Sequence, residues 1–241
     1  MLTFFSGFGL GTILLPVFLF FFDPIVSIAL TAIVHFLNNL FKLSLLWKNI
    51  DWNTGLRFGI PAMIGSLGGS LLLFSMGSIV LVKYKLGDAE LQIELLKILV
   101  AALLVFFAIL EIIPFIRLTV TQKHLPVGGL ISGFFGGLTG HQGAIRSLFM
   151  IKLGLGKEIY IATGVIIACF IDITRLGVYA NHLQGVDLTE SLPFLIAAVL
   201  AAFAGALAGN YLLKKVTLRS LQVCVAIMII IFSFALGLGI I

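Results

Sequence analysis

Apolar runs of about 20 residues follow one another along almost the whole of this chain. A membrane-spanning α-helix needs about 20 mainly apolar residues, because each residue adds about 1.5 Å. Of the 241 residues, 61% are hydrophobic and only 10% are charged, whereas about 25% of a soluble domain is charged. A soluble fold could not hide so much apolar surface. The sequence therefore predicts an all-α polytopic membrane protein. It excludes a water-soluble enzyme, a nucleic-acid-binding protein and a disulfide-rich secreted module.

We predict about eight transmembrane helices, which together take up most of the chain. They cover approximately residues 3–22, 24–46, 56–76, 93–115, 127–152, 158–179, 192–213 and 218–240. The links between them are too short for an extramembrane domain. Residues 77–86 are left open between an extension of the third helix and a segment along the interface.

The basic residues predict the orientation of the chain. With eight helices, the links after odd-numbered helices lie on one side of the membrane and the other links lie opposite. The first group carries eight basic residues, which are Lys83, Lys85, Lys97, Lys152, Lys157, Lys214, Lys215 and Arg219. The second group carries four, which are Lys48, Arg57, Arg117 and Lys123. Because cytoplasmic links carry the excess of Lys and Arg, both termini are predicted on the non-cytoplasmic side.

Two parts of the chain resemble each other, which predicts two transmembrane repeats at residues 1–120 and 121–241. The glycine-rich segments at residues 6–12 and 132–140 both begin Ser-Gly-Phe, and each precedes a long helix. Four helices per half is an even number, so simple duplication predicts two parallel halves. A broken or re-entrant first helix in either half would change that count. Transporters are often built from such repeats, with their sites at the repeat interface.

Alignment of the second helix of each half places polar residues at matching points. Asn39 stands opposite Asp172. Three residues later, Lys42 stands opposite Arg175. On the first of these helices the polar residues His35, Asn38, Asn39 and Lys42 fall at i, i+3, i+4 and i+7. That spacing puts them on one face. Such a face favours a binding function, and the alternative is hydrogen bonding that holds membrane helices together.

Four charged residues lie inside predicted spans, namely Lys42, Arg146, Asp172 and Arg175. A charge at the bilayer centre costs about 2.5–3.5 kcal/mol, so its presence requires an explanation. The alternative for Asp172 and Arg175 is a mutually neutralised structural pair. The alternative for Lys42 is a side chain that extends to the interface. Because three cations accompany one anion, a cavity on which they converge would favour anions.

Residues 136–143, Gly-Gly-Leu-Thr-Gly-His-Gln-Gly, form a polar and glycine-dense segment inside the fifth apolar span. Glycine costs a helix about 1 kcal/mol relative to alanine, so we expect this segment to be unwound or broken. Free backbone N–H groups at the start of a half-helix attract anions. Arg146 adds a forked donor suited to an oxyanion. The candidate binding residues here are Thr139, Gly140, His141, Gln142 and Gly143.

The first half carries a weaker form of this pattern at residues 7–12, which adds Gly11 and Thr12 to the candidate binding residues. The alternative is close helix packing, because small residues four apart let membrane helices approach each other. Packing is the preferred interpretation for Gly65 and Gly69. We expect no cofactor and no metal ion, since the cysteines lack the spacing of metal ligands.

The chain resembles the TauE/SafE sulfite exporter family in its glycine-rich first helices, its long second helices, its eight predicted spans and its length. Residues 9–16, Gly-Leu-Gly-Thr-Ile-Leu-Leu-Pro, are similar to the glycine run followed by proline of that family. The second half departs from it, since Arg146 stands about where the proline is expected. The resemblance implies transport of sulfite, sulfonates or related sulfur-containing anions across the inner membrane.

The favoured hypothesis is a secondary transporter of small anions whose two halves rock about a site at the midplane. Asp172 and Arg175 would form a gate or an orienting pair. His35 or His141 would carry a coupling proton, because histidine changes charge near physiological pH. The alternatives are a small-anion channel, an assembly subunit, and an intramembrane enzyme, which would need paired carboxylates or a Ser–His couple. The expected partners are the lipid bilayer and a small anion, with no nucleic acid, in a monomer or a homodimer.

Overall fold

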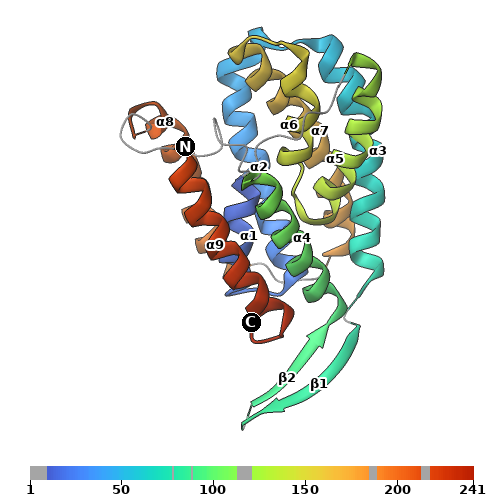
Figure 1. Cartoon of the computed structure of the whole chain (residues 1–241), viewed down its shortest axis with the longest axis vertical. Coiled ribbons are helices and arrows are strands. Elements are labelled where there is room, and N and C mark those ends of the chain that lie inside the picture. The colour runs from blue at the N-terminus through green and yellow to red at the C-terminus, as the bar shows by residue number, and fades with distance from the viewer. Residues whose placement is uncertain (1–9, 78, 88, 113–120, 185–188, 213–217) are drawn as a thin grey trace.

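The computed structural model describes residues 10–77, 79–87, 89–112, 121–184, 189–212 and 218–241, which form a helical bundle with one β-hairpin (Figure 1). The helices are α1 (Leu10–Leu19), α2 (Pro24–Leu46), α3 (Trp52–Ser75), α4 (Leu95–Ile112), α5 (Leu125–Thr139), α6 (Gly143–Met150), α7 (Lys157–His182), α8 (Leu192–Leu212) and α9 (Leu218–Gly237). The hairpin consists of β1 (Val80–Leu86) and β2 (Ala89–Glu94). Short 3-10 turns lie at Trp47–Asn49, Gln122–His124, Ile151–Leu153 and Thr189–Ser191.

Four helical segments in the described part of the chain are long and apolar enough to cross a membrane. They are Pro24–Asn49, Trp52–Ser75, Lys157–His182 and Thr189–Ala206, and shorter apolar helices lie at Leu10–Leu19, Leu95–Leu110 and Val225–Gly237. Ile64, Leu200 and Phe234 are each more than 60% exposed, which suits side chains that face lipid. The prediction of a polytopic helical protein is thus confirmed, while the total of eight spans stays a prediction.

Helices α2 and α7 form the centre of the bundle and run in opposite directions. The residues that follow α2 contact the beginning of α7, because Asn49 Nδ2 donates to Glu158 Oε2 at 2.9 Å. The two helices begin at Pro24 and Lys157, and the alignment of the predicted repeat places these two residues opposite each other. Proline suits the first turn of a helix, where its missing N–H costs no hydrogen bond.

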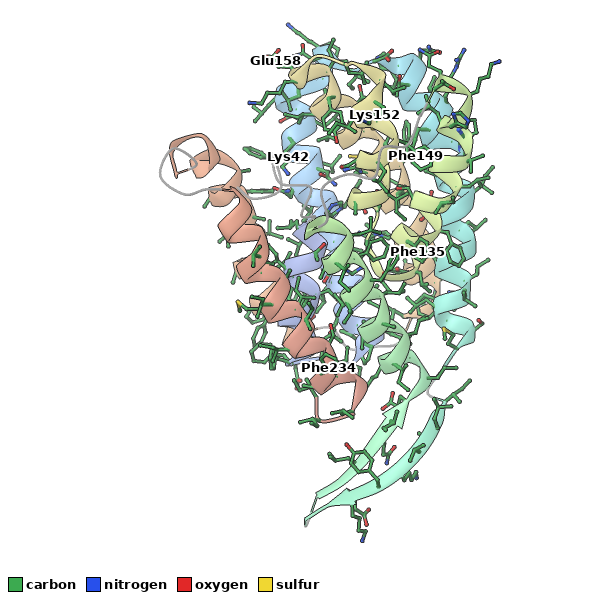
Figure 2. The ribbon with its side chains drawn as sticks, viewed as in Figure 1. Lys42, Phe135, Phe149, Lys152, Glu158 and Phe234 are labelled. Atoms are coloured by element: carbon green, nitrogen blue, oxygen red, sulfur yellow. The ribbon has the colours of Figure 1, made fainter. Side chains whose placement is uncertain are left out.

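Helices α5 and α6 form a hairpin that enters the bundle and returns to the same end. The break between them begins at Gly140, whose φ of 88° is a left-handed conformation that glycine adopts without strain. Leu125, at the start of α5, and Met150, at the end of α6, belong to one buried cluster. Figure 2 shows Phe149 and Lys152 toward the same end of the bundle as Glu158. The break predicted from glycine density is present, but residues 127–152 do not cross the bundle as one helix.

This reversal corrects the predicted assignment of links to the two sides of the membrane. Arg57 donates to Gln122 Oε1 at 3.1 Å, and Asn49 binds Glu158. The links that contain Lys48, Lys123, Lys152 and Lys157 therefore share one end of the bundle. The β-hairpin, which carries Lys83 and Lys85, lies at the other end (Figure 1). Strict alternation failed because the re-entrant hairpin adds a reversal that hydropathy does not register.

The second helices of the two predicted repeats, α2 and α7, also run in opposite directions rather than in parallel. Helices α2 and α7 are antiparallel, as their contacts show. The described part of α1 begins beside Gly140, since a Cβ on Gly11 would lie 3.5 Å from the Gly140 carbonyl oxygen. From there α1 runs to the turn before Pro24, whereas α6 runs to the opposite end. Duplication of four crossing helices would have made α2 and α7 parallel. The re-entrant α5–α6 hairpin adds one reversal of the chain, so the two helices are antiparallel. The repeat boundary at residue 120 stays a prediction.

Helices α3 and α5 pack backbone against backbone through glycine. A Cβ on Gly65 or Gly69 of α3 would overlap the carbonyl oxygen of Leu130 or Phe134 on α5. In return, a Cβ on Gly133 would overlap the Ala62 carbonyl oxygen. In a bilayer the hydrophobic effect does not drive helices together, because lipid tails are as apolar as the side chains. Close approach of the two backbones instead stabilises the helix pair through van der Waals contacts. The packing interpretation of Gly65 and Gly69 is confirmed.

Substitution of Gly65 by alanine is expected to lower the free energy of unfolding by about 1–3 kcal/mol, because the new methyl group meets backbone that cannot move away. Gly68, on the same helix, has open space around it. The matched variant Gly68→Ala should therefore be neutral or stabilising by up to about 1 kcal/mol. Thermal unfolding of both variants in detergent measures the difference. Equal melting temperatures would contradict the packing model.

The β-hairpin extends beyond the helices at the end where the C-terminus lies (Figure 1). Residues 77–86, left open in the sequence between a helix and an interfacial segment, contribute the strand β1. Tyr84 pairs with Leu91 and Lys83 with Gln92, so apolar and polar residues alternate on the two faces. The Tyr84 hydroxyl donates to the Leu238 carbonyl oxygen at 2.6 Å and ties the hairpin to the end of α9.

Candidate functional site

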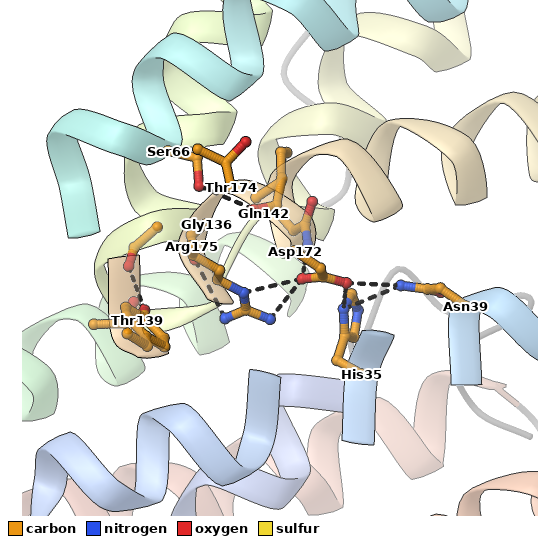
Figure 3. Close-up of polar contacts among 12 residues, drawn as sticks. His35, Asn39, Ser66, Gly136, Thr139, Gln142, Asp172, Thr174 and Arg175 are labelled. Carbon is orange, nitrogen blue, oxygen red and sulfur yellow. Dashed lines mark hydrogen bonds and ion pairs between the residues drawn. The ribbon is translucent and has the colours of Figure 1, made fainter. Parts of the chain in front are cut away.

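The carboxylate of Asp172 is the centre of a buried polar cluster formed by α2, α7 and the α5–α6 break (Figure 3). Its Oδ1 accepts from Arg175 Nη2 at 2.7 Å and from Nε at 3.0 Å. The same oxygen accepts from Gln142 Nε2 at 3.2 Å. Its Oδ2 contacts His35 Nδ1 at 2.6 Å and accepts from Asn39 Nδ2 at 3.2 Å. Donors thus surround both oxygens, as an ionised buried carboxylate requires.

Arg175 neutralises Asp172 and also stabilises the end of α5. Its Nη1 donates to the Gly136 carbonyl oxygen at 3.3 Å. The Tyr179 hydroxyl donates to the carbonyl oxygen of Gly137, which also accepts from Ser70 at 3.3 Å. The carbonyl end of a helix carries partial negative charge, so these contacts satisfy the C-terminus of α5 inside the bundle. Arg175 is therefore committed to Asp172 and to α5.

The N-terminus of α6 opens toward the same region. Gln142 is its N-cap residue, and its side chain makes no capping hydrogen bond to the first turn. The Ser132 hydroxyl donates to the Gln142 carbonyl oxygen at 2.9 Å and fixes the break against α5. The first N–H groups of a helix lack partners within the helix and carry partial positive charge. The turn that begins at Gly143 is therefore suited to an anion.

Arg146 follows one turn into α6 and is half-buried. Its Nη1 donates to Gln142 Oε1 at a long 3.5 Å. A Cβ on Gly164 of α7 would lie 3.5 Å from Arg146 Nε, an ordinary van der Waals distance, so α7 packs directly beside the guanidinium. Among the described residues, no carboxylate lies within salt-bridge distance of Arg146. Lys42 is buried, and its charge lies near enough to that of Arg146 for the two to repel.

The remaining candidates surround the break. His141 Nδ1 contacts the Thr139 hydroxyl at 3.0 Å, and its ring stacks on Phe107 of α4 with 5.0 Å between centroids. Within the described residues, neither His141 Nε2 nor Asn38 Oδ1 has a hydrogen-bond partner, although both are buried. Thr12 is buried in α1, and no hydrogen bond between described residues joins it to the cluster.

The candidate site is enclosed in this structure. The polar side chains of the site other than Arg146 are less than one-tenth exposed. A cavity of about 640 Å³ lies elsewhere, at the end of the bundle near Asp23, Lys97 and Glu190. No group of three His, Cys, Asp or Glu side chains within the described ranges is placed to hold a metal ion.

The sequence reasoning missed two residues that the structure places at the site. Thr31 lies one turn before His35 on the same face of α2, close to Gly11, and its hydroxyl is buried without a partner among described residues. The i, i+4 spacing to His35 was the signal that could have found it. Gly164 gave no signal, because its position beside Arg146 depends on the packing of α6 against α7.

Comparison with known proteins decides the family. The model of the family described as "Sulfite exporter TauE/SafE" matches residues 1–236. The chain belongs to the TauE/SafE sulfite exporter family. The resemblance inferred from its glycine-rich segments is thereby confirmed. No curated protein and no solved structure matches the chain significantly.

TauE/SafE membership agrees with the apolar helices of the fold. The chain is a multi-pass membrane protein of a family of exporters of sulfite and related sulfur-containing anions. The family is one of transporters rather than enzymes. The partners that follow from membership are a small anion and the lipid bilayer.

Proposed function

We propose that this protein is an inner-membrane secondary transporter of sulfite or small organosulfonates that works by alternating access. The observation that carries the proposal is the open N-terminus of α6 beside Arg146. Half-helix N-termini that point at an anionic substrate near the midplane are a recurring feature of secondary transporters. The proposed anion contacts are Arg146, the first turn of α6 from Gly143, and Lys42.

The balance of charge supports an anionic substrate. Arg175 offsets Asp172 through two short contacts. Arg146 and Lys42 are two further cations in the interior of the bundle, and their charges repel each other. A bound anion would relieve that repulsion and occupy the α6 N–H groups. The planar guanidinium suits the oxygens of sulfite or a sulfonate.

The enclosure of the site favours a carrier over the alternative of a channel. A channel needs a continuous wet path, whereas the polar side chains around Asp172 are almost fully buried. The Asp172 carboxylate also joins α2 of the first half to α7 and the break of the second. A change in those contacts would let the halves move, so Asp172 and Arg175 are proposed as the gate.

The proposed direction places the end with Lys48, Arg57, Lys123, Lys152 and Lys157 in the cytoplasm, because its described links carry more basic residues than the hairpin end. The C-terminus, at the hairpin end, then lies outside. Met1 lies outside the described residues, so its predicted side rests on the sequence alone. A proton is proposed to accompany the anion on His35 or His141, and the protein to act as a monomer or a homodimer.

Ligand-induced stabilisation of the purified protein tests the proposal. Sulfite or methanesulfonate at 100 times its Kd should add about 2.7 kcal/mol of stability, which corresponds to a rise in melting temperature of roughly 5–10 °C. Sodium chloride at the same ionic strength should give no comparable rise. In proteoliposomes both anions should show slow, saturable flux. Single-channel currents would favour the channel. The absence of both ligand-induced stabilisation and flux would refute an anion function.

A further inference from the structure

Gln142 physically connects the proposed anion site to the Asp172 carboxylate. It lies at the start of α6 and is 1% exposed. Its Nε2 donates to Asp172 Oδ1 at 3.2 Å, while its Oε1 accepts from Arg146 Nη1 at 3.5 Å. The Gln142 amide group therefore contacts both the arginine that we propose as the anion contact and the Asp172 carboxylate.

The opposite oxygen of that carboxylate holds His35 in one tautomer. Asp172 has no proton to give when it is paired with Arg175, so the 2.6 Å contact requires a proton on His35 Nδ1. The lone pair of the neutral ring is then on Nε2, and no hydrogen bond between described residues engages that atom. A proton that binds there arrives from one side of the membrane and leaves to the other, while the Nδ1–H···Asp172 contact is kept.

The ionisable groups around His35 make its charge dependent on a bound anion. Helix α7 contributes Asp172 and Arg175, which cancel. Lys42 lies on the same helix, Arg146 on α6, and His141 in the break. Helix α1 and the described side chains of α8, which also pack on α2, bring no ionisable group. A proton on His35 thus adds a positive charge to a region that already holds Lys42 and Arg146, and a bound anion offsets it.

We infer that Gln142 is a positioning residue that couples anion binding at Arg146 to protonation of His35, so that one proton travels with each anion. The inference rests on the proposed function. By linkage, an anion that favours the protonated ring is itself bound more tightly when the ring is protonated. His35 is assigned this role over His141, because His141 contacts the Thr139 hydroxyl and the Phe107 ring but no carboxylate.

The ratio of proton flux to anion flux tests this coupling. Methanesulfonate is the probe, since it stays ionised and carries no proton itself, and a pH-sensitive dye inside proteoliposomes reports proton entry. The wild type should move about one proton per anion. In Gln142→Met and in His35→Gln the ratio of proton flux to anion flux should fall at least fivefold.

Two matched controls separate coupling from general damage. Gln122→Met removes a similar arginine–glutamine hydrogen bond, to Arg57, at the surface. His182→Gln removes a histidine at the far end of α7, where its ring stacks on Phe74. Both variants should keep the wild-type ratio.

The outcomes distinguish the coupling from the function on which it rests. Methanesulfonate flux without proton flux in the wild type would overturn the coupling and leave the transporter proposal intact. Absence of both methanesulfonate and sulfite flux in the folded wild type would overturn both. A Gln142→Met variant that loses proton and anion flux in equal proportion would show a merely structural role, and a lost ratio in His141→Asn with a kept ratio in His35→Gln would overturn the assignment.

Discussion

The variant Asp172→Ala is expected to lose about 3–5 kcal/mol of stability, because removal of one partner leaves an uncompensated buried charge. The guanidinium of Arg175 is 1% exposed and would lose both of its contacts to the carboxylate. Asn39 and Gln142 would also lose an acceptor. For a chain of this size, the loss corresponds to a fall in melting temperature of roughly 6–20 °C in detergent.

An ion pair at the surface serves as the control, because it has the same contact distance as the buried pair and differs from it in burial. Lys85 and Glu90 on the β-hairpin are joined at the same 2.7 Å as Arg175 and Asp172, but both side chains are 74% exposed. Glu90→Ala should therefore cost less than about 1 kcal/mol. The double variant Asp172→Ala/Arg175→Met should be more stable than Asp172→Ala alone, because it removes the stranded cation. Equal effects of Asp172→Ala and Glu90→Ala would contradict the buried cluster.

Where a helix is long, mainly apolar and bounded by clear end signals, the sequence predicted it well. The expected span at residues 24–46 coincides with α2 (Pro24–Leu46), since Asp23-Pro24 marks its start and Trp47 its end. The alignment of the repeat also matched the starts of α2 and α7. It paired Asn39 with Asp172, and the two side chains are in contact at 3.2 Å. Matching positions on two antiparallel helices can meet where the helices pack together, which accounts for that contact.

Chain reversal inside the membrane was the main feature that hydropathy did not predict. A helix that crosses and a hairpin that returns have the same apolar composition, and only the left-handed Gly140 separates α5 from α6. Once that reversal was missed, the direction of every later helix was wrong. The strand β1 was recognisable in principle, because Val82, Lys83, Tyr84 and Lys85 alternate with a period of two.

The sequence singled out the buried charged residues of the candidate site but not the contacts among them. The cost of burying charge singled out Asp172, Arg175, Arg146 and Lys42 from the sequence. Their pairing could not be read in the same way, since His35 and Asp172 are 137 residues apart and meet only because α2 and α7 pack together. The structure pairs Arg175 with Asp172, and Arg146 is the residue that we propose as the main contact of the anion.

Replacement of Arg146 by alanine is expected to give the largest functional effect, a loss of about 2–5 kcal/mol in anion binding. That range corresponds to a rise in Kd of roughly 30-fold to several thousand-fold. The reason is that Arg146 would supply a forked donor beside the α6 N-terminus, whereas its hydrogen bond within the described part of the chain is a long 3.5 Å contact to Gln142. Sulfite and methanesulfonate affinity from ligand-induced melting shifts, together with proteoliposome flux, measures the loss.

A conservative substitution of Arg146, and substitutions of two other basic residues, define what Arg146 contributes to anion binding. Arg146→Lys keeps the charge but not the planar fork, so its affinity should fall between those of the wild type and Arg146→Ala. Lys42→Ala should also weaken binding, because it removes a buried cation near Arg146. Arg57→Ala, which removes an exposed arginine bound to Gln122, should change affinity less than threefold. Unchanged flux in both Arg146→Ala and Lys42→Ala would reject this site and require the anion to bind elsewhere in the bundle.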